Sequence, residues 1–135
     1  MPYRFLEHTA DVKFRATGEN LNEMFISAAE ALNETIRGDI KILEQKEKTF
    51  EIKEKDVENL LYNFLEEFLF LLDAENFLVS KIKSIEIKDN ELKCIVTGDS
   101  AENYKFTNDV KAITYSNMFV REENGKFKCQ VVLDV

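Results

Sequence analysis

Two segments of the chain repeat apolar residues at the spacing of an α-helix. Residues 21–37 place apolar side chains three and four positions apart, so that they share one face. Asn20 begins a capping motif, and Gly38 suits the end of this helix. Residues 57–75 keep the same period after Asp56 and become apolar around a wider arc near their end. The pattern therefore predicts two helices, and we expect the second to lie centrally across a sheet.

Most of the remaining chain alternates apolar and polar residues, which is typical of strands. The strands predicted in this way are residues 3–7, 12–17, 40–53, 82–88, 91–97, 104–106, 113–121 and 126–133. Hairpin turns are expected at Asp89-Asn90 and at Glu123-Asn124-Gly125. Strands and helices do not alternate one for one, which argues against a doubly wound parallel sheet. We expect an α+β fold, a two-layer sandwich with two main helices packed on one face of a mostly antiparallel or mixed sheet. The 135 residues form a single predicted domain.

The net charge of the chain bears on its binding partners more than on its fold. The formal net charge is −8, and basic residues alternate with acidic ones along the chain, as in Lys53-Glu54-Lys55. Nucleic-acid-binding domains usually carry a basic stripe, and the sequence shows none. We therefore expect no direct, stable binding of nucleic acid, and any role in RNA chemistry should pass through a protein partner. An acidic surface suits cations and basic partners.

Two cysteines and the absence of long apolar segments bear on the cellular compartment. Cys94 and Cys129 are far apart and fall on the apolar side of predicted strands, so we expect two buried, reduced thiols. The first ten residues contain no apolar signal core, and no segment is an uncharged 18-residue stretch. These features predict a cytoplasmic protein without a membrane segment.

The polar patch His8-Thr9-Ala10-Asp11 interrupts the first two predicted strands. It contains the single histidine of the chain, which is either a hydrogen-bonding loop residue or part of a site. Asp11 shares the outward side of the strand with Lys13 and Arg15, if the strand extends back to it. Its carboxylate then reaches solvent or a cation without burying a charge.

The last residues carry a second acidic candidate. Asp134 falls opposite the apolar positions of the final strand, and the carboxylate of Val135 adds a negative oxygen donor. Oxygen donors suit hard cations such as Ca²⁺ and Mg²⁺. These groups are either half of a cation site or a solvated chain end. In the first case, even a short extension or truncation at this end should disturb the site.

Signals for catalysis are few. The sequence has no nucleophile elbow, no histidine cluster and no glycine-rich phosphate loop. Asp109, Lys111 and Tyr115 lie close in sequence and suggest either acid–base chemistry or a lysine paired with a carboxylate at a strand entrance.

Three segments in order resemble the archease family over essentially the full length. They are His8-Thr9-Ala10-Asp11, Asp109-Val110-Lys111-Ala112-Ile113-Thr114-Tyr115 and Val131-Val132-Leu133-Asp134-Val135. The resemblance implies a two-layer α/β fold and a metal site described with calcium. It also implies a role in tRNA splicing as a cofactor of the RtcB-type RNA ligase, promoting its guanylylation and multiple turnover. Some members carry His where this chain has Ser116, so no role is expected at that position.

Carried onto this chain, the resemblance implies metal ligands at Asp11, Asp134 and Val135, with Lys111 and His8 as supporting residues. The expected cofactor is a divalent cation, Ca²⁺ first and Mg²⁺ or Mn²⁺ as alternatives. No catalytic residue is expected, so the chain is predicted to activate an RNA ligase rather than to be an enzyme. Two other functions stay open: a small metal-dependent hydrolase that uses both aspartates, and a general chaperone-like interaction module.

Overall fold

The computed structural model describes residues 2–6 and 11–135. Its elements, in chain order, are β1 (Tyr3–Leu6), β2 (Val12–Gly18), α1 (Leu21–Arg37), β3 (Lys46–Lys53), α2 (Val57–Glu75), β4 (Phe77–Lys88), β5 (Glu91–Ser100), the 3-10 helix η1 (Ala101–Asn103), β6 (Ala112–Glu123) and β7 (Lys126–Asp134). Within the described ranges, no helix is both long and apolar enough to cross a bilayer.

Both predicted helices are confirmed with the bounds that their sequence pattern indicated. The side chain of Asn20 accepts the N–H of Glu23 at 2.9 Å, which satisfies a free donor at the start of α1. Asp56 does the same for Asn59 at 2.8 Å at the start of α2. Gly38 ends α1 with φ +68°, a conformation that glycine adopts without a steric penalty.

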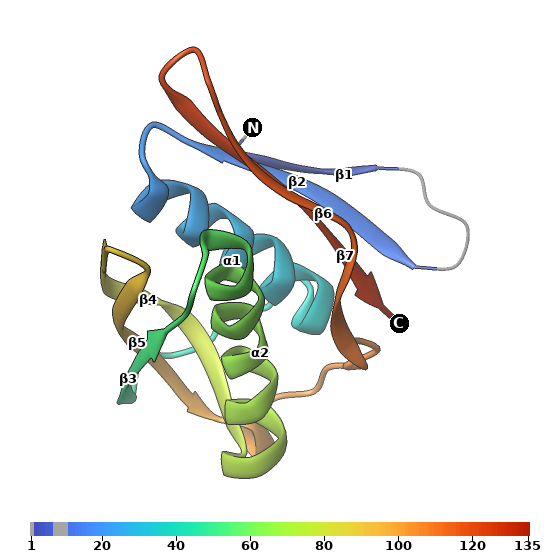
Figure 1. The fold of residues 1–135 in the computed structure, drawn as a ribbon. Helices are drawn as coiled ribbons and strands as arrows, with labels where there is room; N and C mark the ends of the chain where they lie inside the picture. The colour runs from blue at the N-terminus through green and yellow to red at the C-terminus, as the bar shows by residue number, and fades with distance from the viewer. Residues whose placement is uncertain (1, 7–10) are drawn as a thin grey trace.

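The strands form two antiparallel sheets. The larger has the order β1-β2-β7-β6 and the smaller the order β3-β5-β4. In Figure 1 the four-stranded sheet covers the helices from above, and the three-stranded sheet lies below and to the left. The antiparallel α+β class and the two helices are confirmed, but the sequence pattern did not indicate the division into two sheets. Alternation reports which side of a strand is buried and carries no information on which strand lies beside it.

The core lies between the sheets and is built on both helices. α1 packs on β1, β2 and β7 of the larger sheet and on β4 of the smaller, while α2 packs on β3 and β4 and on β6. An aromatic cluster marks its centre, with the Phe64 ring centroid 5.3 Å from that of Phe25 and 5.2 Å from that of Phe68. Because each helix contacts both sheets, the helices fix the position of one sheet relative to the other.

Two predicted strands are wrong in part or altogether. Residues 40–45 belong to no strand, and the main-chain groups of Ile40, Ile42 and Leu43 bond to side chains instead. Arg37 donates to the Ile40 carbonyl at 2.8 Å, and the Leu43 N–H donates to the Tyr104 hydroxyl at 2.9 Å. Residues 104–106 form no strand either, since the Tyr104 hydroxyl is turned to donate to Asp99 at 2.8 Å. At residues 40–43 side-chain partners thus replace ladder hydrogen bonds.

Candidate functional site

The first and last long strands of the larger sheet pair along their whole length. Val12 of β2 lies opposite Leu133 of β7, and the pairing continues to Gly18 opposite Phe127. Asp11 and Asp134 are the next residues beyond the Val12–Leu133 pair, one on each chain segment. Figure 1 shows the beginning of β2 beside the end of β7. Two aspartates more than one hundred positions apart in the sequence therefore lie at one end of the sheet.

β6 brings a third predicted residue to this end of the sheet. Ala112 is paired with Asp134, and the backbone N–H of Lys111 donates to the Asp134 carbonyl at 2.7 Å. The Asp134 backbone is thereby held between β2 and the start of β6. The structure thus brings together Asp11, Lys111, Asp134 and the adjacent Val135, four of the five residues predicted for the site.

The side chains at this end face as predicted. Leu133 is fully buried, whereas Asp134 is exposed and Asp11 is partly exposed. The carboxylates therefore keep contact with water, which avoids the large cost of burying charge. Val135 is partly buried, and its side chain packs against the core. Val135 directly follows Asp134, so its main-chain oxygen lies close to the Asp134 residue.

The donors at this edge suit a hard cation but do not enclose one. Across residues 2–6 and 11–135, no three His, Cys, Asp or Glu side chains gather in a group that could hold a metal ion. A cation here would take carboxylate oxygens from Asp11 and Asp134, a main-chain oxygen of Val135 and further ligands from water or a partner. His8 lies outside the described residues.

Acid–base chemistry at Tyr115 receives no support from its surroundings. The hydroxyl donates to the Asn59 side-chain oxygen at 2.6 Å, and the ring stacks on Tyr62 with centroids 4.0 Å apart. Burial, followed by the negative charge of nearby carboxylates such as Glu54, raises the pKa of Tyr115, so the phenol stays protonated at neutral pH. This tyrosine joins β6 to α2 next to the Lys111 edge, a contact that the sequence analysis missed.

The described lysines and cysteines give no nucleophile at this edge. Lys111 is exposed and forms no ion pair within the described part of the chain, so the predicted pairing with a carboxylate is not seen. Cys94 and Cys129 are buried and reduced, as predicted. Burial raises the pKa of both thiols to about 12, which leaves them protonated and unreactive.

Known proteins resemble this chain along nearly all of its length. The model of the Archease protein family matches residues 3–135. A protein archease of Methanosarcina mazei is 33% identical over 98% of this chain and 95% of its own length. One from Pyrococcus furiosus is 36% identical over 96% of this chain and 95% of its own length.

Solved structures show the same fold. The solution structure of Methanobacterium thermoautotrophicum protein 1598 has a TM-score of 0.83 and 35% identity, and covers 99% of both chains. The crystal structure of a Thermotoga maritima archease, described as a possible chaperone, has a TM-score of 0.66 and 20% identity, covers 96% of this chain and 94% of its own, and supports the fold alone. The full-length family match and the similar sequences agree with the three motifs, and the chain belongs to the archease family.

Proposed function

We propose that this protein is an accessory factor of tRNA splicing that activates an RtcB-type RNA ligase, promoting its guanylylation and multiple turnover. Membership of the archease family supports the assignment to this process. The observation that carries the mechanism is the antiparallel β2–β7 register, in which Asp11 and Asp134 are the next residues beyond the Val12–Leu133 pair. In this proposal the protein completes the active site of its partner and is not an enzyme by itself.

The proposed activating element is a divalent-cation site with Asp11, Asp134 and a main-chain oxygen of Val135 as ligands. Ca²⁺ is the first expected occupant, and Mg²⁺ or Mn²⁺ also suit oxygen ligands. A divalent ion at this edge supplies positive charge beside a nucleotide triphosphate. The residues themselves present their oxygens from the ends of paired strands, a rigid support that holds donors in place.

Lys111 and His8 are proposed supporting residues. Lys111 is fastened to the site by its backbone bond to Asp134, which leaves its ammonium group exposed and available to a partner phosphate or carboxylate. The side chain of His8 precedes Asp11 by three positions and is proposed to assist at the same edge. Ligands and supporting residues together give a surface that is incomplete until a partner covers it.

The test measures two quantities on the same set of variants. Asp11→Asn and Asp134→Asn keep the side-chain shape and remove one negative charge each. We expect both variants to lose at least tenfold in Ca²⁺ affinity by isothermal titration and in stimulation of guanylylation of the cognate ligase. Their melting temperatures should stay within a few degrees of the parent, because Asp134 is exposed and Asp11 is partly exposed.

Asp109→Asn is the matched control, since Asp109 is an exposed aspartate near Lys111 that lies before β6. This variant should keep both cation affinity and ligase stimulation. Full stimulation by the Asp11 and Asp134 variants would overturn the proposed mechanism, whereas no stimulation by the parent protein would overturn the proposed function itself.

Two other functions can be distinguished from this one by further assays. A metal-dependent hydrolase that uses both aspartates would turn over substrate without any partner. A general chaperone would protect unrelated proteins from aggregation. Protection of such clients that persists in Asp134→Asn, with no effect on ligation, would support the chaperone.

A further inference from the structure

The outer face of the four-stranded sheet is defined by a row of cross-strand pairs. Arg4 of β1 lies opposite Arg15 of β2, Arg15 opposite Gln130 of β7, and Gln130 opposite Phe119 of β6. The alternate residues of β2, such as Phe14, are fully buried beneath this row. Side chains of the row therefore point away from the helices.

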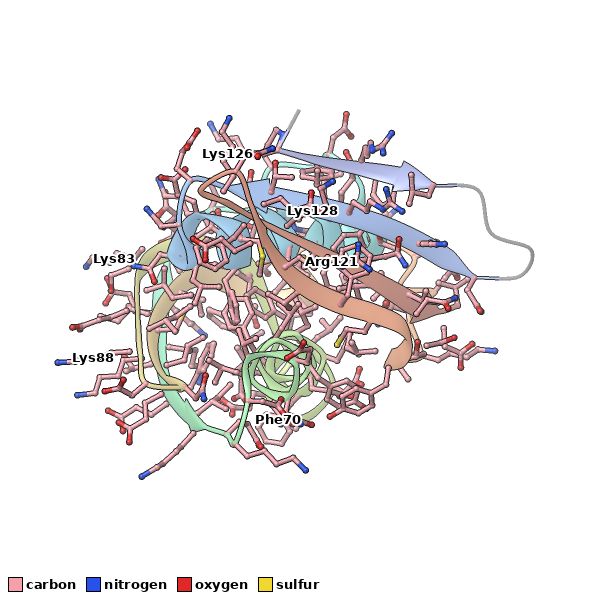
Figure 2. The ribbon with its side chains drawn as sticks, turned by 45° about the horizontal axis from the view of Figure 1, so that its top comes forward. Phe70, Lys83, Lys88, Arg121, Lys126 and Lys128 are labelled. Atoms are coloured by element: carbon pink, nitrogen blue, oxygen red, sulfur yellow. The ribbon has the colours of Figure 1, made fainter. Side chains whose placement is uncertain are left out.

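This face gathers basic side chains in a chain whose net charge is −8. Five of its basic residues are Arg4, Lys13, Arg15, Arg121 and Lys128. Lys126 lies on the same side and is paired with Glu19 at 3.5 Å. The five include three of the four arginines in the sequence. Figure 2 labels Arg121 and Lys128 over this sheet. We name these five residues the basic face.

The two sheets differ in how many of their basic residues form ion pairs. Five of the seven lysines of the smaller sheet are paired with glutamates, for example Lys83 with Glu47 at 2.6 Å and Lys53 with Glu91 at 3.1 Å. On the basic face, within the part of the chain that the structure describes, only Lys128 has an ion pair, with Glu123 at 3.4 Å. Unneutralised cations in an acidic protein indicate an anionic partner.

An aromatic ring lies among these cations. The Arg121 guanidinium carbon is 4.0 Å from the Phe119 ring centroid, and that of Arg15 is 5.8 Å away. Arg15 is held by its bond to the Gln130 side chain at 2.9 Å, and Gln130 in turn donates to the Asn117 carbonyl at 2.8 Å. Arg15 is therefore held in place by hydrogen bonds, and Arg121 lies close over the Phe119 ring.

We infer that the basic face binds single-stranded RNA. Guanidinium groups bind phosphate through paired hydrogen bonds, and flat aromatic or guanidinium surfaces stack on bases. The carboxylates of an acidic protein would form ion pairs with these cations but would not stack on Phe119 and Arg121. Cations around a partly exposed aromatic ring match single-stranded nucleic acid, which carries both phosphates and exposed bases.

The basic face and the candidate cation site lie on the same side of the sheet. Lys128, Gln130, Val132 and Asp134 alternate along β7, so they share the outer side of the sheet. The six positions from Lys128 to Asp134 span about 20 Å. Gln130 and Val132 are buried, so no exposed path follows β7 from Lys128 to Asp134, and RNA binding to the basic face does not rest on the proposed function.

No basic stripe runs along the sequence, so direct and stable nucleic-acid binding is not expected from the sequence alone. The stripe exists only in the folded protein, since β1, β2, β6 and β7 each contribute a part of it. The RNA-binding inference therefore differs from the expectation based on the sequence.

The experiment measures fluorescence anisotropy of a fluorescein-labelled uridine 12-mer titrated with the full chain at several salt concentrations. For five phosphate contacts, the logarithm of the affinity should fall with the logarithm of the salt concentration with a slope of about −3.5. Arg4→Glu combined with Arg121→Glu should weaken binding at least tenfold and make the slope shallower by about 1.4. Phe119→Leu should weaken binding about tenfold with little change in slope.

The matched control is Lys83→Glu combined with Lys88→Glu, which makes the same charge change on the smaller sheet (Figure 2). RNA binding in this control should stay within about threefold of the parent. Equal losses in both double variants, or no binding at 20 mM salt, would overturn the inference. So would tighter binding of poly-glutamate or of phosphatidylserine vesicles than of RNA. Stimulation of ligase guanylylation, which needs no RNA, tests the proposed function separately.

Discussion

The backbone N–H of Lys111 donates to the carbonyl of Asp134 at 2.7 Å, which fastens the start of β6 to the last residue of β7. This bond and the neighbouring Ala112–Asp134 pair set the height of Asp134 at the sheet edge. The main chain of Lys111 and its side chain therefore have separate tasks. The main chain positions a proposed ligand, and the exposed ammonium group is free to meet a partner.

Substitutions at position 111 separate these two tasks. Lys111→Ala keeps the N–H, so the free energy of unfolding should change by less than about 0.5 kcal/mol while ligase stimulation falls. Lys111→Pro removes the donor and should lower the free energy of unfolding by about 1 kcal/mol or more and weaken Ca²⁺ binding. Urea denaturation and calcium titration measure both effects. Equal calcium affinity in the two variants would show that the backbone bond does not position Asp134.

Close packing between β4 and β5 makes Gly98 sensitive to substitution. An added Cβ would overlap the Leu78 carbonyl oxygen and approach the Phe77 ring to 2.8 Å. Gly98→Ala should therefore lower the free energy of unfolding by about 3 kcal/mol, as expected for overpacking. Gly125→Ala is the control, because nothing lies within 4 Å and only its φ of +78° opposes a side chain. That variant should lose about 1–2 kcal/mol. Similar losses in urea denaturation would contradict this account.

The two thiols should be unreactive in the native protein. Burial raises the pKa of Cys94 and of Cys129 to about 12, so almost no thiolate exists at pH 8. Ellman's reagent should label neither residue until denaturant is added, whereas an exposed thiol introduced by Ser116→Cys should react within minutes. In the unfolded chain thiols ionise near pH 9, so stability should fall as the pH rises between 9 and 12. Rapid labelling of the native parent would contradict the prediction.

The hydrogen bond from Tyr104 to Asp99 predicts a pH-dependent contribution to stability. The Tyr104 hydroxyl, followed by the Ser100 N–H, lowers the pKa of Asp99 below its ordinary value of 3.8. A carboxyl group whose pKa is lowered by folding stabilises the fold at pH values above its ordinary pKa of 3.8. This contribution is lost as the pH falls through the folded-state pKa. Tyr104→Phe should lower the melting temperature by a few degrees at pH 7. The difference from the parent should shrink below pH 3.8.

Tyr115→Phe provides the matched control for this pH dependence. Its hydroxyl donates to the neutral side chain of Asn59, which does not titrate. The change in melting temperature caused by Tyr115→Phe should therefore be the same at pH 7 and pH 3. A constant difference for Tyr104→Phe as well would show that the charge of Asp99 contributes nothing.

Features that depend on nearby residues followed directly from the sequence. The apolar period and the capping side chains of Asn20 and Asp56 define both helices, because helix hydrogen bonds close within four positions. The turns at Asp89-Asn90 and Asn124-Gly125 carry positive φ angles, which these residue types accept most readily. Strand alternation also placed Asp134 on the exposed side of β7. Each of these features uses information within a few residues.

The rest needed the tertiary structure, since it depends on which distant segments lie side by side. Alternation put Asp11 and Asp134 on outward positions, but only the β2–β7 register brings them to the same end of the sheet. Four strands supply the basic face, whose arginines are scattered along an acidic sequence. The sequence by itself determined the elements and the outward sides of their residues. Which outward residues meet was decided by the pairing between remote strands. Strands can form hydrogen bonds with each other whatever their separation along the chain.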